Sequence, residues 1–273
     1  MRTIKRLVVK VGTAELTGVD GKLNCAFQLL AEQIARLRRN GIRTVVVSSG
    51  AILAGRQANA ALGINGSKMS KKLLAACGMD VLITRWREAF APYGLSVCQL
   101  LATFYNSVLQ DERRSIRSTL REAMDSGRIV PIVNENDPVS PAEIKLMDLH
   151  FSENDVLASV IANIVGANAI IFFSDAGGVY EHNPRAGDSG RKYRTLDAWN
   201  IPRVLLPKRS AVASASALGR GGIESKITAA ARCHRAGMRV AIAKLNGTPE
   251  ILRQFVRGGS VGTMMGSKTV FYE

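Results

Sequence analysis

The sequence contains few aromatic and few cysteine residues. Aromatic side chains make up 5% of the 273 residues, although 47% of the chain is hydrophobic. We therefore expect a core of valine, isoleucine, leucine and alanine, as in a buried parallel sheet covered by helices. The cysteines Cys25, Cys77, Cys98 and Cys233 lie far apart and form no CxxC pair. This spacing disfavours a zinc site or a disulfide framework and fits a reducing cytoplasm.

Long apolar runs are also missing. No hydrophobic run reaches the roughly 18 residues that would indicate a membrane span. The N-terminal sequence MRTIKRLVVKVG has a short apolar run that meets Lys10 almost at once. It therefore indicates a first strand and not a signal peptide. The sequence predicts a cytoplasmic protein with no membrane partner.

Several common catalytic motifs are absent as well. The three histidines, His150, His182 and His234, lie in no Ser/His/Asp-like context, and there is no HExxH motif or nucleophile elbow. The chain also lacks GxxxxGK[ST], and no GxGxxG follows the first strand. A hydrolase with a histidine base is therefore poorly supported.

Basic residues are in clear excess, since the net charge is +15. Such a charge indicates anionic partners or simply a solvated basic surface. From Arg191 to Arg239 there are eleven Lys or Arg residues against two acids, Asp197 and Glu224. These residues are scattered, and no aromatic-rich basic tract of the kind that stacks on bases occurs. We therefore expect no nucleic-acid partner.

Short β-branched runs alternate with amphipathic stretches, which favours a mostly parallel sheet. The pattern predicts an α/β fold, a three-layer α/β/α sandwich, in one domain over 1–273 with halves 1–165 and 166–273. The segment 185–217 is rich in Ser, Pro and charge and is predicted to be an irregular loop or lid. Strands are expected at 7–11, 44–47, 129–133, 169–173, 239–243 and, at an edge, 269–272. Helices are expected at about 24–41, 156–165, 223–236 and 248–256.

Four polar segments follow predicted strands or open a predicted helix. Open α/β sheets bind ligands beyond the carboxyl ends of their strands. Each segment also has a purely structural interpretation, as an edge-strand lysine, a helix cap or a turn. Their occurrence together is what favours an anion-binding site. The segments are Lys10–Thr13, Ser48–Ala51, Asn134–Asp137, and Gly219–Gly222 with Lys226.

The absence of a base is compatible with one reaction in particular. A carboxylate with a pKa of about 4.3 is already ionised at neutral pH, so phosphoryl transfer to it needs no base. The site must align two anions and offset the developing charge. Two lysines, glycine amides and a metal ion would suffice, so the segments favour transfer of the γ-phosphoryl group of ATP to a small carboxylate.

At these segments the sequence resembles the amino-acid kinase family, and within it the members that phosphorylate glutamate. The resemblance spans nearly the whole chain and rests on VVKVGT, VVSSGAILAG, LLAACG, IVPIVNENDPV, FSENDVLAS, SDAGGVYEHNPR, GRGGIESKITAAA and SVGT. The chain departs from the usual family pattern at Met79, at Ser152-Glu153, at Ser174 and at Arg220. The segment 145–150 also looks longer than usual.

The resemblance implies ATP-dependent phosphorylation of the side-chain carboxylate of L-glutamate, the first step of proline biosynthesis. Lys10 and Lys226 would bracket the transferring phosphoryl group, and Asp155 would orient both lysines. Mg²⁺ would bridge the ATP phosphates, with no metal ligand expected from the protein. The residues implied for glutamate are Ser49, Gly50, Asn134, Asp137 and Asn154. Those implied for the nucleotide are Lys10, Ser174, Asp175, Arg220, Gly221, Gly222, Ile223, Glu224, Ser225 and Lys226.

The resemblance also implies a homodimer or homotetramer and suggests proline as a feedback inhibitor. The small RNA-binding-like domain found at the C-terminus of many relatives is not expected here. Two alternatives remain open at this point. One is a kinase of the same fold acting on another carboxylate, a carbamate or a nucleotide. The other is a non-catalytic, ligand-sensing paralogue.

Overall fold

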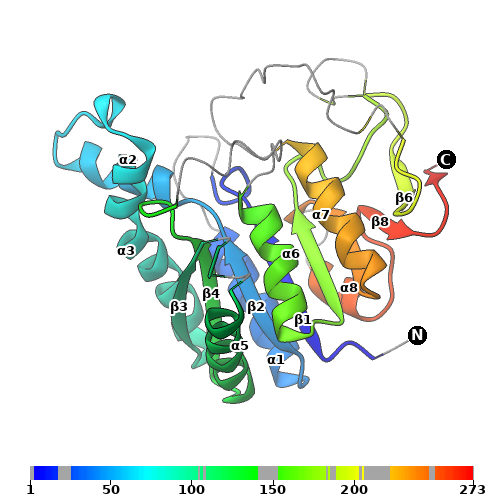
Figure 1. Cartoon of the computed structure of the whole chain (residues 1–273), viewed down its shortest axis with the longest axis horizontal. Helices are drawn as coiled ribbons and strands as arrows, with labels where there is room; N and C mark the ends of the chain where they lie inside the picture. Colours follow the sequence, from blue (N-terminus) through cyan, green and yellow to red (C-terminus); the bar gives the residue numbers. More distant parts are fainter. Residues whose placement is uncertain are drawn as a thin grey trace. The chain divides into compact units, whose positions relative to one another are not determined.

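The structure is a computed structural model, and Figure 1 shows its helices and strands. It describes residues 3–17, 26–103, 105–106, 109–140, 153–182, 184, 189–202, 205, 222–245 and 250–272. The chain forms two compact units, which are described separately. One is Val11–Leu149, and the other combines Met1–Lys10 with His150–Glu273.

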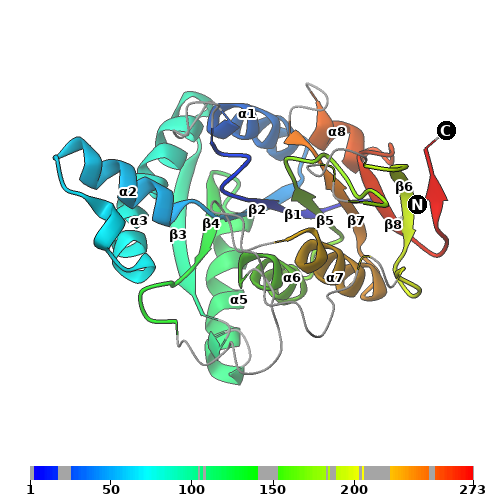
Figure 2. The same ribbon diagram turned by 90° about the horizontal axis from the view of Figure 1, so that it is seen from above.

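The unit Val11–Leu149 is built on parallel strands in the order β3-β4-β2. Helix α1 lies on one face of these strands and α5 on the other (Figure 2). Phe27 of α1 packs edge-on against Trp86 of α3, with ring centroids 4.7 Å apart. The strands are β2 (Arg43–Ser48), β3 (Ser96–Ala102) and β4 (Ile129–Glu135), and the α-helices are α1 (Ala26–Arg39), α2 (Ala51–Ala61), α3 (Lys71–Phe90) and α5 (Gln110–Asp125). The 3-10 helices are η1 (Gly66–Lys68) and η2 (Ala91–Tyr93).

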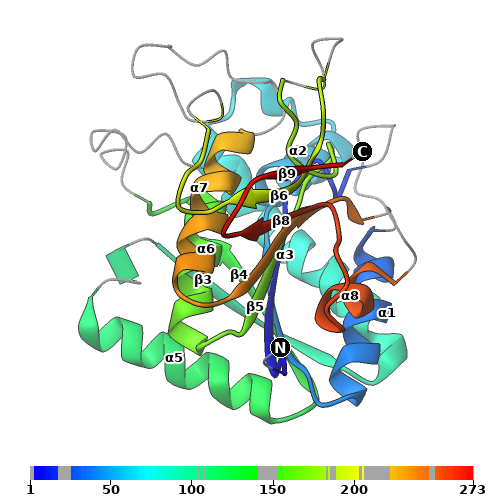
Figure 3. The same ribbon diagram turned by 90° about the vertical axis from the view of Figure 1, so that its right-hand side faces the viewer.

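The second unit carries strands in the order β1-β5-β7-β8-β6-β9. Strands β1, β5 and β7 are parallel, β8 runs antiparallel to β7, and β6 is parallel to β8. Helices α6 and α7 cover one face and α8 the other (Figure 2). Strands β8, β6 and β9 lie side by side (Figure 3). The strands are β1 (Arg6–Val11), β5 (Ala169–Phe173), β6 (Tyr193–Asp197), β7 (Arg239–Ala243), β8 (Thr263–Gly266) and β9 (Val270–Phe271), and the helices are α6 (Glu153–Val165), α7 (Ile223–Arg235) and α8 (Ile251–Val256).

The predicted α/β class with mostly parallel strands is confirmed. Each expected strand and helix is present among the described residues, and the start of the last helix falls at Ile251. The predicted end of α1 is also confirmed, because Gly41 adopts a left-handed φ of 77° just beyond the helix. The sequence interpretation had set no bounds for α3, β3 or α5.

The prediction that 185–217 is irregular is wrong for Tyr193–Asp197. These residues form β6, which pairs with β8 in parallel and with β9 in antiparallel orientation. The strand is short and carries two charged residues, Arg194 and Asp197, so its own sequence indicates a strand only weakly. The strands that it pairs with, β8 and β9, lie much later in the chain. Most of the remainder of the predicted lid lies outside the described residues.

Two glycines let α2 and α3 approach very closely. A Cβ atom on Gly55 would lie 1.9 Å from the carbonyl oxygen of Leu74, and one on Gly78 would lie 2.0 Å from that of Ala51. No side chain larger than hydrogen fits at either position unless the helices separate. The hydroxyl of Ser70 caps the start of α3 by accepting a hydrogen bond from the Leu73 amide at 3.1 Å.

None of the helices that the structure describes combines the length and the apolar character that a membrane span requires.

Candidate active site

A buried carboxylate lies between two lysines in the second unit. Asp155 Oδ1 lies 2.8 Å from Lys10 Nζ, and Asp155 Oδ2 lies 3.6 Å from Lys226 Nζ. Lys10 is on β1, whereas Asp155 and Lys226 lie in the first turns of α6 and α7. The exposed fractions of Lys10, Asp155 and Lys226 are 2%, 0% and 8%. The structure thus brings together the three residues that the sequence predicted as catalytic.

Ser225 provides a further hydrogen bond to this carboxylate. Its hydroxyl lies 2.6 Å from Asp155 Oδ2, and the Ser225 side chain is buried. Burial alone would raise the pKa of Asp155, but the charges of Lys10 and Lys226 and the hydrogen bonds from Lys10 and Ser225 together lower it. Asp155 is therefore held as a carboxylate that can orient both ammonium groups.

The cluster has the electrostatic character of an anion site. Two ammonium groups and one carboxylate leave one net positive charge in a buried setting. Lys226 also lies in the first turn of α7, where the helix dipole and free amides favour negative charge. Gly222 is the N-cap of this helix and has no side chain that would keep a ligand away from the amides of the first turn. A phosphoryl group suits this arrangement.

The predicted nucleotide residues Ser174 and Asp175 follow β5 directly. Ser174 is buried, and its amide donates to the carbonyl oxygen of Ala243 at 2.8 Å. The Gly177 amide donates back to the Ser174 carbonyl oxygen at 2.9 Å, which closes a tight turn. Asp175 is exposed at the tip of this turn. The turn therefore presents one carboxylate at the carboxyl end of a parallel strand.

Thr263 holds the segment that follows this turn. Its hydroxyl accepts a hydrogen bond from the Val179 amide at 2.9 Å and donates to the Tyr193 carbonyl oxygen at 2.6 Å. Thr263 is fully buried at the start of β8. Because β6 and β8 run opposite to β5 and β7, their first residues lie at the carboxyl ends of β5 and β7. Because β8 runs antiparallel to β7, Thr263, the last residue of the SVGT motif, supports the segment that follows the turn after β5.

In the other unit, Ser49 and Gly50 form the connection between β2 and α2. The Ser49 amide donates to the carbonyl oxygen of Val11 at 3.0 Å, and Gly50 has a left-handed φ of 114°. The preceding residue, Ser48, is fully buried and accepts a hydrogen bond from the indole N–H of Trp86 at 3.0 Å. The predicted strand-to-helix turn is present, and only glycine adopts the conformation at position 50 without strain.

Asn134 and Asp137 lie at the end of β4 and in the turn after it. Asn134 is 2% exposed, and its Oδ1 accepts a hydrogen bond from the Glu135 amide at 2.9 Å. This bond orients the amide so that Nδ2 is the remaining donor. Within the part of the chain that the structure describes, buried Nδ2 has no hydrogen-bond partner. An unpaired buried donor is costly, so a ligand acceptor at this position would stabilise it.

The other predicted residues have varied outcomes. Asn154 is half-buried beside Asp155 at the start of α6, and Ile223 and Glu224 form the first turn of α7. Arg220, Gly221, Ser152 and the segment 145–150 lie outside the described residues. Met79, one of the departures from the family pattern, is buried in α3. The sequence analysis did not single out Ser140 or the connection from Ser225 to Asp155, because serine is too common to indicate a role.

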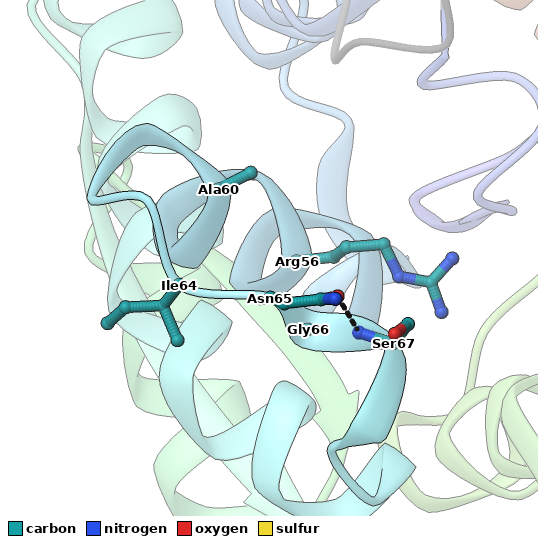
Figure 4. A pocket seen from close by; sticks show the side chains of 6 residues that line it. All are labelled: Arg56, Ala60, Ile64, Asn65, Gly66 and Ser67. Atoms are coloured by element: carbon teal, nitrogen blue, oxygen red, sulfur yellow. Dashed lines mark hydrogen bonds between the residues drawn. The ribbon is translucent and has the colours of Figure 1, made fainter.

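One pocket lies between the end of α2 and η1 in the unit Val11–Leu149 (Figure 4). Asn65 accepts a hydrogen bond there from the Ser67 amide at 2.9 Å. The lining residues are Arg56, Ala60, Ile64, Asn65, Gly66 and Ser67. The pocket contains none of the predicted site residues.

In the described ranges, no group of three or more His, Cys, Asp or Glu side chains could hold a metal ion.

Comparison with known proteins gives consistent matches. The sequence profile of the amino acid kinase family matches residues 5–244. The glutamate 5-kinase of Sodalis glossinidius is 36% identical over 266 residues, which cover 96% of this chain and 69% of the relative. The glutamate 5-kinase of Photorhabdus laumondii is 38% identical over 270 residues, with the same two coverages. The glutamate 5-kinase of Escherichia coli O1:K1 is 38% identical over 267 residues, which cover 97% of this chain and 69% of the relative.

A solved structure supports the fold independently. The crystal structure of UMP kinase from Bacillus anthracis aligns with a TM-score of 0.65 and covers the whole of both chains. Its sequence identity to this chain is 16%, so the likeness concerns the fold alone. The predicted fold and the predicted family are both confirmed by these matches.

Proposed function

The chain belongs to the amino acid kinase family, and we propose that it transfers the γ-phosphoryl group of ATP to the side-chain carboxylate of L-glutamate. The product would be L-glutamyl 5-phosphate, and the reaction would open proline biosynthesis. The observation that carries this proposal is the pair of buried lysines held by Asp155. The relatives named glutamate 5-kinase support glutamate as the acceptor.

The proposed transfer needs no general base. A carboxylate oxygen of glutamate forms a bond to the γ-phosphorus, the bond from that phosphorus to the β–γ bridging oxygen breaks, and ADP leaves. No proton moves, because the attacking carboxylate is ionised at neutral pH. Lys10 and Lys226 stabilise the charge on the transferring group and on the leaving oxygen. Asp155, which contacts both ammonium groups, keeps them oriented toward the transferring group.

The nucleotide is proposed to bind through residues of the second unit. The first turn of α7, with Gly222, Ile223, Glu224 and Ser225, supports phosphate binding by its amides and dipole. Asp175 suits a hydrogen bond to a nucleotide hydroxyl because it is exposed after β5. Ser174, Arg220 and Gly221 are assigned to the same site on the strength of the family resemblance.

Glutamate is proposed to bind through Ser49, Gly50, Asn134, Asp137 and Asn154. The free donor of Asn134 suits a glutamate carboxylate oxygen, and the carboxylate of Asp137 suits the α-ammonium group. The amide and hydroxyl of Ser49 and the carboxamide of Asn154 would complete the polar contacts. This assignment would give an acceptor to Asn134 Nδ2, which is buried and has no hydrogen-bond partner among the described residues.

Mg²⁺ fits the described residues as a partner of the nucleotide. Magnesium in kinases is usually held by phosphate oxygens and water with only one or two carboxylates. The one carboxylate in the lysine cluster, Asp155, is already paired with two cations. The ATP phosphates would therefore hold the metal, which would neutralise part of their charge when bound.

Further properties are proposed from the family membership. They are a homodimeric or homotetrameric assembly, inhibition by proline, and a cytoplasmic location. We also propose that the residues that bind the acceptor lie mainly in 1–165 and that those that bind the nucleotide lie mainly in 166–273.

The test is turnover with a panel of acceptors. The purified protein is incubated with Mg·ATP and L-glutamate, L-aspartate, a carbamate or a nucleoside monophosphate, and ADP release is followed. We expect the highest kcat/KM with L-glutamate. A nucleoside monophosphate as the best acceptor would reject glutamate and favour another kinase of this fold. Binding of ATP without turnover of any acceptor would favour a ligand-sensing protein.

A further inference from the structure

A buried hydrogen bond closes the turn that follows β4. The Ser140 hydroxyl donates to Glu135 Oε1 at 2.5 Å, and these residues are 6% and 2% exposed. The amides of Val139 and Ser140 both donate to the Asn136 carbonyl oxygen, at 3.1 and 3.0 Å. The first and last residues of the segment 135–140 are thus joined, and its interior is fixed as a compact turn. We call this segment the acceptor turn.

A lysine from α3 ties the end of the acceptor turn to the helix. Lys72 is an exposed residue, and its Nζ donates to the Ser140 carbonyl oxygen at 2.7 Å. Lys72 lies in the first turn of α3, just after the cap residue Ser70. Ser140 is therefore held twice, by its hydroxyl to Glu135 and by its carbonyl to Lys72.

The geometry of β4 separates Glu135 from the proposed substrate contact. Successive side chains of a strand point to opposite faces, so Asn134 and Glu135 point away from each other. The Glu135 amide orients the carboxamide of Asn134, while the Glu135 side chain bonds to Ser140. Glu135 thus supports the turn from the face opposite to the free donor of Asn134.

We infer that Glu135, Ser140 and Lys72 are positioning residues that set the affinity for the acceptor. This inference rests on the proposed function, because it takes Asn134 and Asp137 as glutamate contacts. Asp137 lies within the acceptor turn and Asn134 directly precedes it. A turn that is fixed before the substrate arrives loses little conformational freedom on binding. Loosening it weakens glutamate binding and leaves ATP binding nearly unchanged.

The experiment compares Ser140→Ala and Lys72→Met with the control Lys71→Met. Lys71 is the exposed neighbour of Lys72, and in the described structure it makes no such contact with the turn. We expect the KM for glutamate to rise about tenfold in Ser140→Ala and about threefold in Lys72→Met, as for the loss of one hydrogen bond. The KM for ATP and kcat should stay within about twofold of the wild type. Ser140→Thr and Lys72→Arg should restore the KM for glutamate.

Several outcomes overturn the inference. One is an unchanged KM for glutamate in both variants; because Lys72 is exposed, its variant is expected to fold even if Ser140→Ala does not. Equal increases in both KM values with a lower Tm would indicate a general structural role and also overturn it. A wild type without glutamate-dependent turnover would reject the proposed function and this inference together. A normal wild type with unaffected variants would reject this inference alone.

Discussion

Lys10 and Asp155 form a buried ion pair, with 2.8 Å between Nζ and Oδ1. Lys226 approaches the other oxygen of the same carboxylate at 3.6 Å. A buried lysine without a counter-charge would be costly, so one carboxylate makes it possible to keep two cations in the interior. Substitutions in this cluster should therefore change both the free energy of unfolding and kcat, and the two effects can be measured separately.

The two lysines should differ in their effect on stability. Lys10→Met removes the closer partner of a fully buried carboxylate and should lower the free energy of unfolding by about 3 kcal/mol. Lys226→Met leaves the 2.8 Å pair intact and should cost about 1 kcal/mol or less. Both should lower kcat at least about 100-fold, because each removes a charge from the transferring group. Urea unfolding and ADP release measure the two effects, and full activity in Lys226→Met would reject its assigned role.

Asp155 should make stability depend on acid pH. Burial raises the pKa of Asp155, but Lys10, Lys226 and Ser225 together bring it below its ordinary value. A lowered pKa means that the carboxylate stabilises the fold above its unfolded pKa, near 4, and that this is lost as the pH falls through the folded pKa. The stability difference between the wild type and Asp155→Asn should be largest at neutral pH and should shrink below about pH 4. Urea unfolding across this pH range tests it, and a difference that stays constant would contradict the lowered pKa.

Ser225 should act through Asp155. Ser225→Ala removes a 2.6 Å hydrogen bond to the carboxylate, so the pKa of Asp155 should rise from its wild-type value. We expect kcat to fall about tenfold, whereas the KM for ATP should change by less than about threefold. Ser225→Thr keeps the hydroxyl and should restore most of kcat. A variant that loses ATP affinity at unchanged kcat would instead place the Ser225 hydroxyl, and not only its amide, against the nucleotide.

The crossing of α2 and α3 should not tolerate an added methyl group. In Gly78→Ala the new Cβ would lie 2.0 Å from the Ala51 carbonyl oxygen and 2.2 Å from the Gly55 amide nitrogen. Both neighbours are backbone atoms, so the helices must separate, at a cost of about 3 kcal/mol or more. Ala60→Ser, at an exposed position of α2, is the control and should change stability by less than about 0.5 kcal/mol. Urea unfolding of the two variants side by side decides the matter, and equal stabilities would show that the crossing can relax.

Sequence reasoning predicted much of the fold because the strong signals are local. Apolar runs such as Leu7–Val11 and Ala169–Phe173 indicate buried strands by themselves. Strand β6 was missed because its sequence, YRTLD, has a weak pattern and depends on pairing with β8 and β9. Its bounds come from tertiary structure, which no local pattern contains.

The candidate site was predicted residue by residue only through the family resemblance. The motifs alone could not show that Lys10, Asp155 and Lys226 meet, since they lie on three different elements. Likewise, neither Ser140 nor Lys72 stands out in the sequence, because a hydrogen bond between α3 and the end of the acceptor turn depends on packing. The structure therefore adds to the sequence mainly the contacts that hold the site residues in place.

The most direct test of the central claim is trapping of the acyl phosphate. The protein is incubated with Mg·ATP, L-glutamate and hydroxylamine, and formation of the γ-glutamyl hydroxamate is measured beside ADP release. We predict one hydroxamate per ADP in the wild type and a rate at least about 100-fold lower in Lys226→Met. ADP release that does not depend on glutamate, or that yields no hydroxamate, would contradict transfer to the side-chain carboxylate.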